Sequence, residues 1–429
     1  MAKGALPGFR DFYPEQFAER AHIQKAWREV ARRFAFVEYD APPLEPLELY
    51  TKKSGEEIVG QLYAFTDKGG REVALRPEMT PSFARMVAAR ANALRKPVRW
   101  FSVPQLFRYE RQQKGRLREH FQLNVDIVGE PDVTADAELL AVAIEIMRAL
   151  GLSHEDVRAR VSDRRLLRLV LLAIGVEDAQ TAGVFAVIDK IERQPVDVTR
   201  EKLAALGLNP GAVDEVLGLT GRVSLQALIE RFGTQGEIGD RLLEMSRYFD
   251  FLRALGVAEW VDLDLKVVRG LAYYTGIVFE LFDAHGEFRA ICGGGRYDTL
   301  LLALGGVDLP ALGFGMGDVV LGELLRARGL VPLHQVAPDY WVAYADPLSL
   351  ATAMQVASQL RAEGSSVEYS LRGSALSHQL KAASAARARE TVIIKADGTC
   401  TIKSMASGEE RNVRLSDGRL DMSQLNPTT

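Results

Sequence analysis

The sequence has few cysteines, no long apolar run and no strong excess of one charge. Cys292 and Cys400 are the only cysteines among 429 residues, too few for a disulfide framework, which favours a reducing compartment such as the cytoplasm. The six histidines are scattered without a metal-binding spacing, so no dedicated metal site is predicted. No apolar stretch reaches the roughly 20 residues that span a bilayer, and the first residues lack the pattern of a signal or transit peptide. We therefore expect a soluble cytoplasmic protein with no membrane contact.

Positive charge is concentrated locally. The formal net charge is -4 and the sequence pI is near 6.0, so the composition gives no global sign of nucleic-acid binding. Residues 105–118 nevertheless hold a single acid, Glu110, and five basic side chains: Arg108, Arg111, Lys114, Arg116 and Arg118. Arginine at this density, beside Phe107 and Tyr109, favours a site for a phosphate-bearing ligand next to an aromatic face. An exposed cationic hairpin without a ligand is the alternative that this stretch alone leaves open.

The flanks of the basic stretch predict a β-hairpin. In FQLNVDIV (121–128) apolar residues alternate with Gln122, Asn124 and Asp126, which is the period of a strand with one buried face. Residues 105–111 have a similar strand character. We therefore expect an arginine-rich loop that overhangs a sheet floor bearing Gln122 and Asp126.

The order of the predicted elements divides the chain into blocks. Residues 1–158 mix long helices with antiparallel strands, residues 159–260 are rich in helix, and strands resume over residues 261–330. From 338 to 429, strand and helix patterns alternate as β-α-β-α-β, which is typical of a small α/β domain with a mostly parallel sheet. The helical block is interpreted as an insertion and the last block as a separate module.

The last block contains a basic stretch, residues 371–389, that has no acidic residue. Its cations are Arg372, Lys381, Arg387 and Arg389. This composition favours contact with an RNA backbone, and a solvated helix face is the alternative.

Two further motifs carry polar groups suited to a small ligand. RPEMT (76–80) sets Glu78 and Thr80 two residues apart, so both would project to one side of an extended backbone and could hold an ammonium group. In VRGLAYYTGIVFE (268–280), Arg269 precedes Tyr273 and Tyr274. The arginine could supply positive charge to a reacting phosphate and the phenols could hydrogen-bond a polar planar ring, although tyrosines beside strands also often pack in a core.

A glycine-rich motif completes the set. CGGGRYD (292–298) has three successive glycines, where a backbone can approach a ligand closely, followed by Arg296 and Tyr297. A glycine run alone is a weak signal because most such runs are turns. The information lies in the order of the four motifs along the chain.

In that order the motifs resemble those of histidyl-tRNA synthetases, a class II aminoacyl-tRNA synthetase family, across nearly the whole chain. The matching segments are PGFRDFYPE, LRPEMT, FRYERQQKGRLREHFQ, VRGLAYYTGIVFE, GGGRYD and LSHQLKAASAARARETVII. The resemblance implies an α+β fold: an antiparallel-sheet catalytic domain (1–158 and 261–330), an inserted helical domain (159–260) and an α/β anticodon-binding domain (338–429). It also implies a homodimer that activates L-histidine with ATP and Mg²⁺ and transfers it to tRNA(His).

The resemblance also implies roles for individual residues. Arg108 and Arg269 would be the catalytic arginines on either side of the α-phosphate of ATP. Glu110 and Arg116 would hold the nucleotide, with Arg116 near its terminal phosphate and Phe121 under the adenine. The residues expected to contact histidine are Glu78, Thr80, Gln122, Asp126, Arg269, Tyr273, Tyr274 and Tyr297, and those expected to contact tRNA are Arg372, Lys381, Arg387 and Arg389.

The chain departs from the family pattern at two positions. Val320 stands where an arginine usually follows the glycine-rich GFGMGDVV (313–320), and the nearest arginines are Arg326 and Arg328. Ala272 stands where an acid usually precedes the paired tyrosines. Two non-catalytic relatives are therefore alternatives: a regulatory subunit of ATP phosphoribosyltransferase, which would lack the C-terminal domain, and a sensor of uncharged tRNA, which would not need both catalytic arginines.

Overall fold

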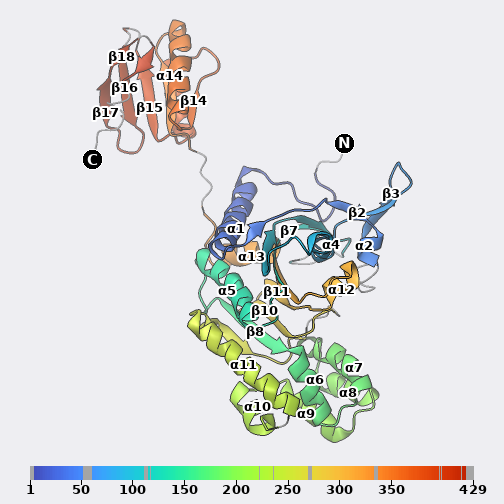
Figure 1. Ribbon diagram of the computed structural model, residues 1–429. Helices are drawn as coiled ribbons and strands as arrows, with labels where there is room; N and C mark the ends of the chain where they lie inside the picture. Colours follow the sequence, from blue (N-terminus) through green and yellow to red (C-terminus); the bar gives the residue numbers. More distant parts are fainter. Residues whose placement is uncertain are drawn as a thin grey trace. The chain divides into compact units, whose positions relative to one another are not determined.

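The computed structural model describes most of the chain in two compact units, residues 1–332 and 333–429 (Figure 1). The described residues are 4–51, 60–110, 115, 117–221, 223–234, 236–268, 273–332, 337–395, 397, 399–416 and 418–421. Each unit has a hydrophobic core of its own and is described by itself.

The larger unit is built on a nine-stranded sheet. In spatial order the main path is β1 (Val37–Glu38), β5 (Val98–Ser102), β7 (Glu119–Val128), β12 (Ala311–Gly317), β11 (Cys292–Arg296), β10 (Ile277–Asp283), β8 (Val157–Asp163) and β9 (Val261–Leu263), with β6 (Gln105–Phe107) paired to β7. The outermost pairs, β1 with β5 and β8 with β9, are parallel, and the pairs between them are antiparallel. The expected antiparallel-rich α+β fold is confirmed.

Helices cover one face of this sheet. They are α1 (Pro14–Arg33), α5 (Thr134–Ala149) and α13 (Asp318–Ala327), which lie together in Figure 1. The alternation predicted for β7 directs Leu123, Val125 and Ile127 into the core beneath them, where Trp27 and Val30 of α1 are also fully buried. Burying an apolar side chain of this size stabilises the fold by roughly 1.5–3 kcal/mol, so this face holds the sheet together.

The opposite face of the sheet is only partly covered. Helices α4 (Thr80–Arg90) and α12 (Leu300–Gly305) pack Phe83 and Leu301 against Val128 and Val278 at one end of it. Beside them lie a short helix and a three-stranded sheet, α2 (Glu48–Thr51), β2 (Leu44–Pro46), β4 (Glu72–Leu75) and β3 (Tyr63–Thr66). The rest of this face, where the polar residues of β7 project, is the floor of the candidate site.

A helical segment connects β8 to β9. It consists of α6 (Arg164–Ala173), α7 (Asp178–Ile188), η1 (Ile191–Arg193), α8 (Val196–Ala205), α9 (Pro210–Leu219), α10 (Leu225–Phe232), α11 (Gly236–Ala254) and η2 (Ala258–Trp260). Buried Asp163 caps α6 by accepting from the Leu166 amide at 2.6 Å, and it also pairs with Arg241 of α11. Residues 159–163, which the sequence pattern assigns to the helical insertion, belong to the sheet instead, because the helices begin only at Arg164.

The smaller unit is an α/β layer. Its sheet runs β14 (Val367–Tyr369), β13 (Tyr340–Tyr344), β15 (Glu390–Ile394), β16 (Cys400–Ser404) and β17 (Glu410–Val413), and β18 (Leu415–Ser416) pairs with β19 (Arg419–Leu420). The helices are η3 (Pro347–Ser349), α14 (Leu350–Ala362) and α15 (Leu376–Ala385). The predicted β-α-β-α-β order with parallel pairing holds for β13, β14 and β15, and the antiparallel strands β16 and β17 extend it.

Candidate active site

Glycine makes the open face of the large sheet hollow. Gly313, Gly315 and Gly317 of β12 pair with Asp126, Asn124 and Gln122 of β7, and Gly293 and Gly295 of β11 pair with Gly315 and Gly313. All of these residues share one face, because side chains alternate along a strand.

The side chains of β7 lie across these glycines. A Cβ added to Gly315 would stand 2.7 Å from Gln122 Nε2, and one added to Gly313 would stand 2.9 Å from Asp126 Cγ. The alternating glycines of GFGMG therefore make room for the two polar side chains that sequence analysis had placed on the floor. This is a packing reason for glycine at both positions, in addition to backbone freedom.

The predicted hairpin is present. Strands β6 and β7 pair antiparallel, with Gln105 opposite Phe121 and Phe107 opposite Glu119. Of the loop between them, the described residues include Gly115, which has φ +76°, in the left-handed region that favours glycine. Arg111, Lys114 and Arg116 lie outside the described residues.

Arg108 stands at the end of β6 and is half-buried. Its Nε donates to the carbonyl oxygen of Pro77 at 2.9 Å, and its Nη1 lies 3.9 Å from Glu110 Oε1. The backbone amide of Phe107 likewise donates to the carbonyl of Arg76 at 3.0 Å. These contacts join the hairpin to the segment that carries Glu78, so the arginine and this buried carboxylate come from adjacent backbone.

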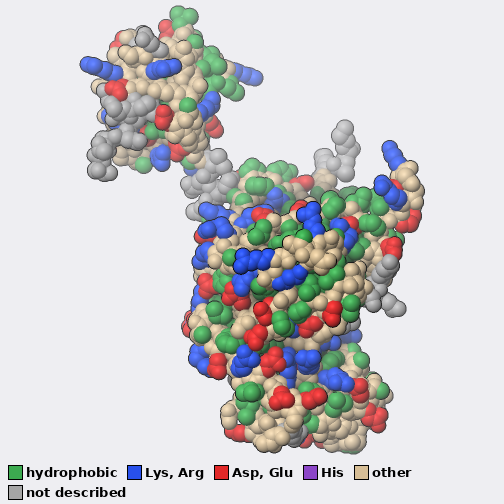
Figure 2. Space-filling view, in the orientation of Figure 1, with side chains coloured by type: hydrophobic (Ala, Val, Ile, Leu, Met, Phe, Trp, Pro, Cys, Tyr) green, Lys and Arg blue, Asp and Glu red, His purple; other side chains and the backbone are tan. Residues whose placement is uncertain are grey.

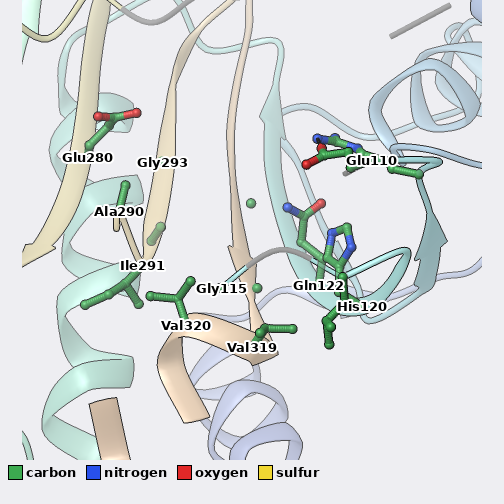
Figure 3. A pocket seen from close by; sticks show the side chains of 15 residues that line it. Glu110, Gly115, His120, Gln122, Glu280, Ala290, Ile291, Gly293, Val319 and Val320 are labelled. Atoms are coloured by element: carbon green, nitrogen blue, oxygen red, sulfur yellow. Dashed lines mark ion pairs between the residues drawn. The ribbon is translucent and has the colours of Figure 1, made fainter. Parts of the chain in front are cut away.

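A cavity of about 240 Å³ lies above the glycine floor. In Figure 3, His120 and Gln122 form one wall, Glu280, Ala290 and Ile291 lie across from them, and Val319 and Val320 close one end. The remaining lining residues are Arg108, Glu110, Gly115, Leu117, Cys292, Gly293, Gly315 and Gly317. The cavity thus combines a cationic group, carboxylates and an apolar end.

Phe121 lies on the other face of β7. Its ring contacts that of Phe12 at a centroid distance of 6.1 Å, and the guanidinium of Arg20 on α1 stands 4.5 Å from its centroid. The structure therefore does not bring Phe121 to the cavity, because β7 directs residue 121 to the same side as Leu123 and Val125. The ring that does line the cavity is that of the preceding residue, His120.

The environment keeps His120 neutral. Burial, together with the nearby charges of Arg108 and Arg10, lowers the pKa of His120 to about 3. At neutral pH the imidazole is therefore an uncharged planar ring. Sequence reasoning missed this residue, although counting the alternation back from Gln122 would have found it.

An N-terminal segment fixes the far side of the hairpin. Arg10 Nε donates to Glu119 Oε1 at 2.6 Å, and Arg10 Nη1 lies 3.0 Å from Asp318 Oδ2. Asp318 in turn accepts the backbone amide of Phe121 at 2.9 Å, and burial raises its pKa despite the adjacent Arg10. The start of β7 and the start of α13, which both border the cavity, are thus held together by one buried ion-pair network.

A second polar group lies farther along β7. Asp126 is 4% exposed and accepts a hydrogen bond from the hydroxyl of Tyr297. Burial raises the pKa of Asp126 to about 7, and the same burial, with the carboxylate next to it, holds the pKa of Tyr297 well above its ordinary value.

Aromatic rings surround this carboxyl group. The ring of Tyr273 lies edge-on to that of Tyr297 at 5.9 Å and 5.0 Å from that of Tyr274. Tyr39, which sequence reasoning missed, packs 5.4 Å from Trp100, and its buried hydroxyl has no hydrogen-bond partner among the described residues. Aromatic rings thus form an enclosure around the carboxyl group of Asp126.

The backbone of RPEMT differs from the extended form we expected. Strand β4 ends at Leu75 and α4 begins at Thr80, with Pro81 in its first turn. Glu78 and Thr80 therefore do not project side by side as on a strand, and Thr80 is a helix N-terminal residue. Proline is tolerated at that position because the first amides of a helix have no intrahelical acceptor.

Arg269, expected opposite Arg108, and Ala272, expected beside the tyrosine pair, lie outside the described residues, as does Arg116. No group of three or more His, Cys, Asp or Glu side chains within the described ranges has the geometry to hold a metal ion. No helix in that part of the chain has both the length and the apolar character for crossing a bilayer.

The four basic residues of the smaller unit that are expected to contact tRNA are exposed. Arg372 precedes α15, Lys381 lies on it, and Arg387 and Arg389 follow it. Arg389 is paired with Asp339 at 2.9 Å, an acid that the sequence of the stretch itself does not contain. On the face of the larger unit drawn in Figure 2, basic and acidic side chains are mixed, as the weak net charge implies.

Comparison with known proteins identifies the family. The model of the family described as histidyl-tRNA synthetase matches residues 8–317. The chain belongs to the histidyl-tRNA synthetase family. It is 46% identical over 397 residues to a histidine–tRNA ligase of Opitutus terrae, covering 92% of this chain and 91% of that one.

Two other relatives agree. A histidine–tRNA ligase, chloroplastic/mitochondrial, of Arabidopsis thaliana is 41% identical over 414 residues, 96% of this chain and 85% of that one. Among solved structures, the histidyl-tRNA synthetase of Nostoc sp. PCC 7120 has a TM-score of 0.82 at 23% identity, covering 96% and 97% of the two chains, which shows the shared fold.

Proposed function

We propose that the protein activates L-histidine with ATP and transfers it to tRNA(His), releasing pyrophosphate and AMP. One observation carries the proposal: the cavity lined by Arg108 has Gly315 and Gly317 of β12 in its floor, and Asp126 pairs with Gly313 of the same strand. Gln122 and Asp126 share one face of β7 four residues apart, about 13 Å at the rise of a strand. This length suits an amino acid joined to an adenylate.

The first step is an in-line substitution at phosphorus. The histidine carboxylate attacks the α-phosphorus of ATP, a carboxylate–phosphorus bond forms, and the bond to pyrophosphate breaks. Negative charge spreads over the phosphoryl oxygens, and Arg108, held by Pro77 and Glu110, faces that charge. Because the arginine is already oriented, it gains interaction in the transition state without reorganising.

Other residues of the site position the two substrates. Asp126 and Tyr297 receive the imidazole, with Tyr273 and Tyr274 enclosing it, while Glu78 takes the ammonium group. Thr80 and Gln122 contact neighbouring parts of the amino acid.

The nucleotide is held at the other end of the floor. Glu110 and the neutral ring of His120 line the cavity there, and Arg116 and Arg269 complete the contacts to the phosphates. Mg²⁺ held by the phosphates would add positive charge. The two carboxylates of the cavity, Glu110 and Glu280, suit this ion, because most of its ligands would be oxygens of phosphate and water.

The second step uses the smaller unit. The terminal ribose hydroxyl of tRNA(His) attacks the carbonyl carbon of the adenylate, an ester bond forms, and AMP leaves. Arg372, Lys381, Arg387 and Arg389 supply exposed positive charge for the RNA backbone on residues 338–429, which we propose as the anticodon-binding domain. We further propose that the protein is a homodimer of the cytoplasm. Light scattering of the purified protein tests the dimer.

The test of this function is aminoacylation. The purified protein is incubated with ATP, Mg²⁺, labelled histidine and a tRNA(His) transcript, with an unrelated tRNA as the control. Acid-stable label on tRNA(His) alone supports the proposal. Absence of label at saturating substrates would favour one of the non-catalytic alternatives, the regulatory subunit or the sensor of uncharged tRNA.

A further inference from the structure

Two separate segments supply the tyrosines that enclose Asp126. Tyr273 and Tyr274 lie shortly before β10, and Tyr297 directly follows β11. The ring of Tyr273 contacts the rings of both other tyrosines, and the hydroxyl of Tyr297 donates to Asp126. The spacing between the two segments therefore decides how much room a ring has beside this carboxyl group.

The segment that carries Tyr297 is fixed to the core of the larger unit. Arg296 is 6% exposed and forms an ion pair with buried Asp136 of α5, and its Nη1 donates to the carbonyl oxygen of Glu130 at 3.0 Å. The backbone amide of Tyr297 donates to the carbonyl oxygen of Ala311, the first residue of β12, at 2.7 Å. The backbone around Arg296 is thus held by a helix on one side and by a central strand on the other.

Thr275 attaches the other segment to this fixed backbone. Its amide donates to the carbonyl oxygen of Arg296 at 2.8 Å. Its hydroxyl accepts from the amide of Asp298 at 3.1 Å and lies 3.4 Å from the carbonyl oxygen of Arg296. One residue next to Tyr274 therefore contacts the backbone on both sides of Tyr297.

The residue after Thr275 also suits close contact between the two segments. A Cβ added to Gly276 would stand 3.2 Å from Arg296 Cδ and 3.4 Å from Arg296 Cβ, so a larger side chain would press on the arginine. The carbonyl oxygen of Gly276 accepts the amide of Arg164, the first residue of α6, at 3.1 Å. Thr275 is therefore followed at once by a residue that α6 also holds.

We propose that Thr275 is a positioning residue for histidine, whose amide and hydroxyl hold the tyrosines of the two segments at the spacing that admits an imidazole ring. The inference rests on the proposed function, in which Asp126 and Tyr297 receive that ring. A hydroxyl suits the role because it donates and accepts at once, so one short side chain serves both a carbonyl and an amide of the facing segment. Thr275 acts through the tyrosines and does not itself contact the substrate.

Two substitutions of Thr275 separate its hydroxyl from its bulk. Thr275→Val keeps the branched shape and removes the hydroxyl, whereas Thr275→Ser keeps the hydroxyl. Thr275→Val is expected to raise the KM for histidine in pyrophosphate exchange, and the dissociation constant of histidine measured by calorimetry without ATP, by about tenfold, because the Asp298 amide loses its acceptor. Thr275→Ser is expected to stay within about twofold of the parent in both constants. The KM for ATP is expected to change less than about twofold in either variant, because its cavity is lined by other residues.

The matched control is Thr181→Val, which removes a hydroxyl that donates to the carbonyl oxygen of Asp178 at 2.7 Å within α7. It is expected to lower the melting temperature and to leave the constants for histidine and ATP unchanged. An equal rise in the KM for histidine in this control would overturn the proposal, because general loss of stability would then explain the effect.

Three other results bear on the role of Thr275. Unchanged constants for histidine in Thr275→Val would overturn the proposal, and so would equal losses in Thr275→Ser and Thr275→Val. Equal rises in the KM values for histidine and ATP would also overturn it, because the role is confined to the histidine end of the floor. A parent protein that binds histidine without any exchange would refute the proposed function, and the calorimetric comparison would still decide the role of Thr275.

Discussion

Replacing Asp126 by asparagine should stabilise the protein while weakening its affinity for histidine. Burial raises the pKa of Asp126 from 3.8 to about 7 in the folded chain. Because the folded-state pKa is the higher one, this carboxyl group favours folding most below pH 3.8, and the advantage is lost as the pH rises to 7. Above pH 7 the ionised group opposes folding by about 4 kcal/mol, from three pH units at about 1.4 kcal/mol each. An amide does not titrate and escapes this penalty.

The expected stability gap therefore depends on pH. Linkage predicts that the unfolding free energy of Asp126→Asn, measured relative to that of the parent, rises by about 2.5 kcal/mol from pH 5 to pH 8. Urea titrations at the two pH values, followed by circular dichroism, measure this difference. The same variant should raise the KM for histidine by roughly 100-fold, because a neutral amide cannot form an ion pair with an imidazolium and accepts a weaker hydrogen bond than a carboxylate does. A difference in unfolding free energy that does not change with pH, or a variant less stable than the parent at pH 8, would refute the claim that the ionised Asp126 carboxylate is buried and opposes folding.

Three further predictions concern other parts of the site. His120→Ala should raise the KM for ATP by about tenfold, because it removes a ring that can stack on the nucleotide base, whereas Phe121→Ala should mainly lower the melting temperature. A raised KM for ATP in Phe121→Ala and an unchanged one in His120→Ala would contradict the alternation along β7. Gly313→Ala should reduce kcat/KM for histidine at least 100-fold in pyrophosphate exchange, because the added Cβ occupies the position of the Asp126 carboxyl group. An unchanged kcat/KM would mean that the carboxyl group is free to move. The double variant Arg372→Ala/Lys381→Ala should raise the KM for tRNA about tenfold or more without changing exchange, and parallel losses in both assays would argue against a role confined to RNA.

The sequence predicted much of the fold because hydrophobic periodicity is a local property. The strand alternation over residues 121–128 located the core side of β7 and its polar side without any tertiary information, and the hairpin followed from two strand-like runs separated by a short loop. The long helices expected within residues 1–158 and the β-α-β-α-β order of the smaller unit came from the same signal.

What could not be predicted depends on contacts between distant segments. The network that joins Arg10, Glu119 and Asp318 spans three segments of the chain, and no local pattern marks it. Asp339, which immediately precedes β13, pairs with Arg389, so the basic stretch is less unbalanced in charge than its own sequence indicates.

Two other differences have local causes that sequence reasoning misjudged. The resemblance implies that Phe121 lies under the adenine, whereas the alternation along β7 directs the ring of residue 121 to the opposite face of the strand. An extended backbone was assumed for RPEMT, although the proline after Thr80 is compatible with the first turn of a helix.

The measurement that tests the central claim most directly is exchange of labelled pyrophosphate into ATP, with each of the twenty amino acids supplied in turn. The account predicts exchange with histidine and none above background with the other nineteen, because Asp126 and Tyr297 form a site for imidazole on the same floor as Arg108. Exchange with a different amino acid, or with none at saturating histidine and Mg²⁺, would contradict it.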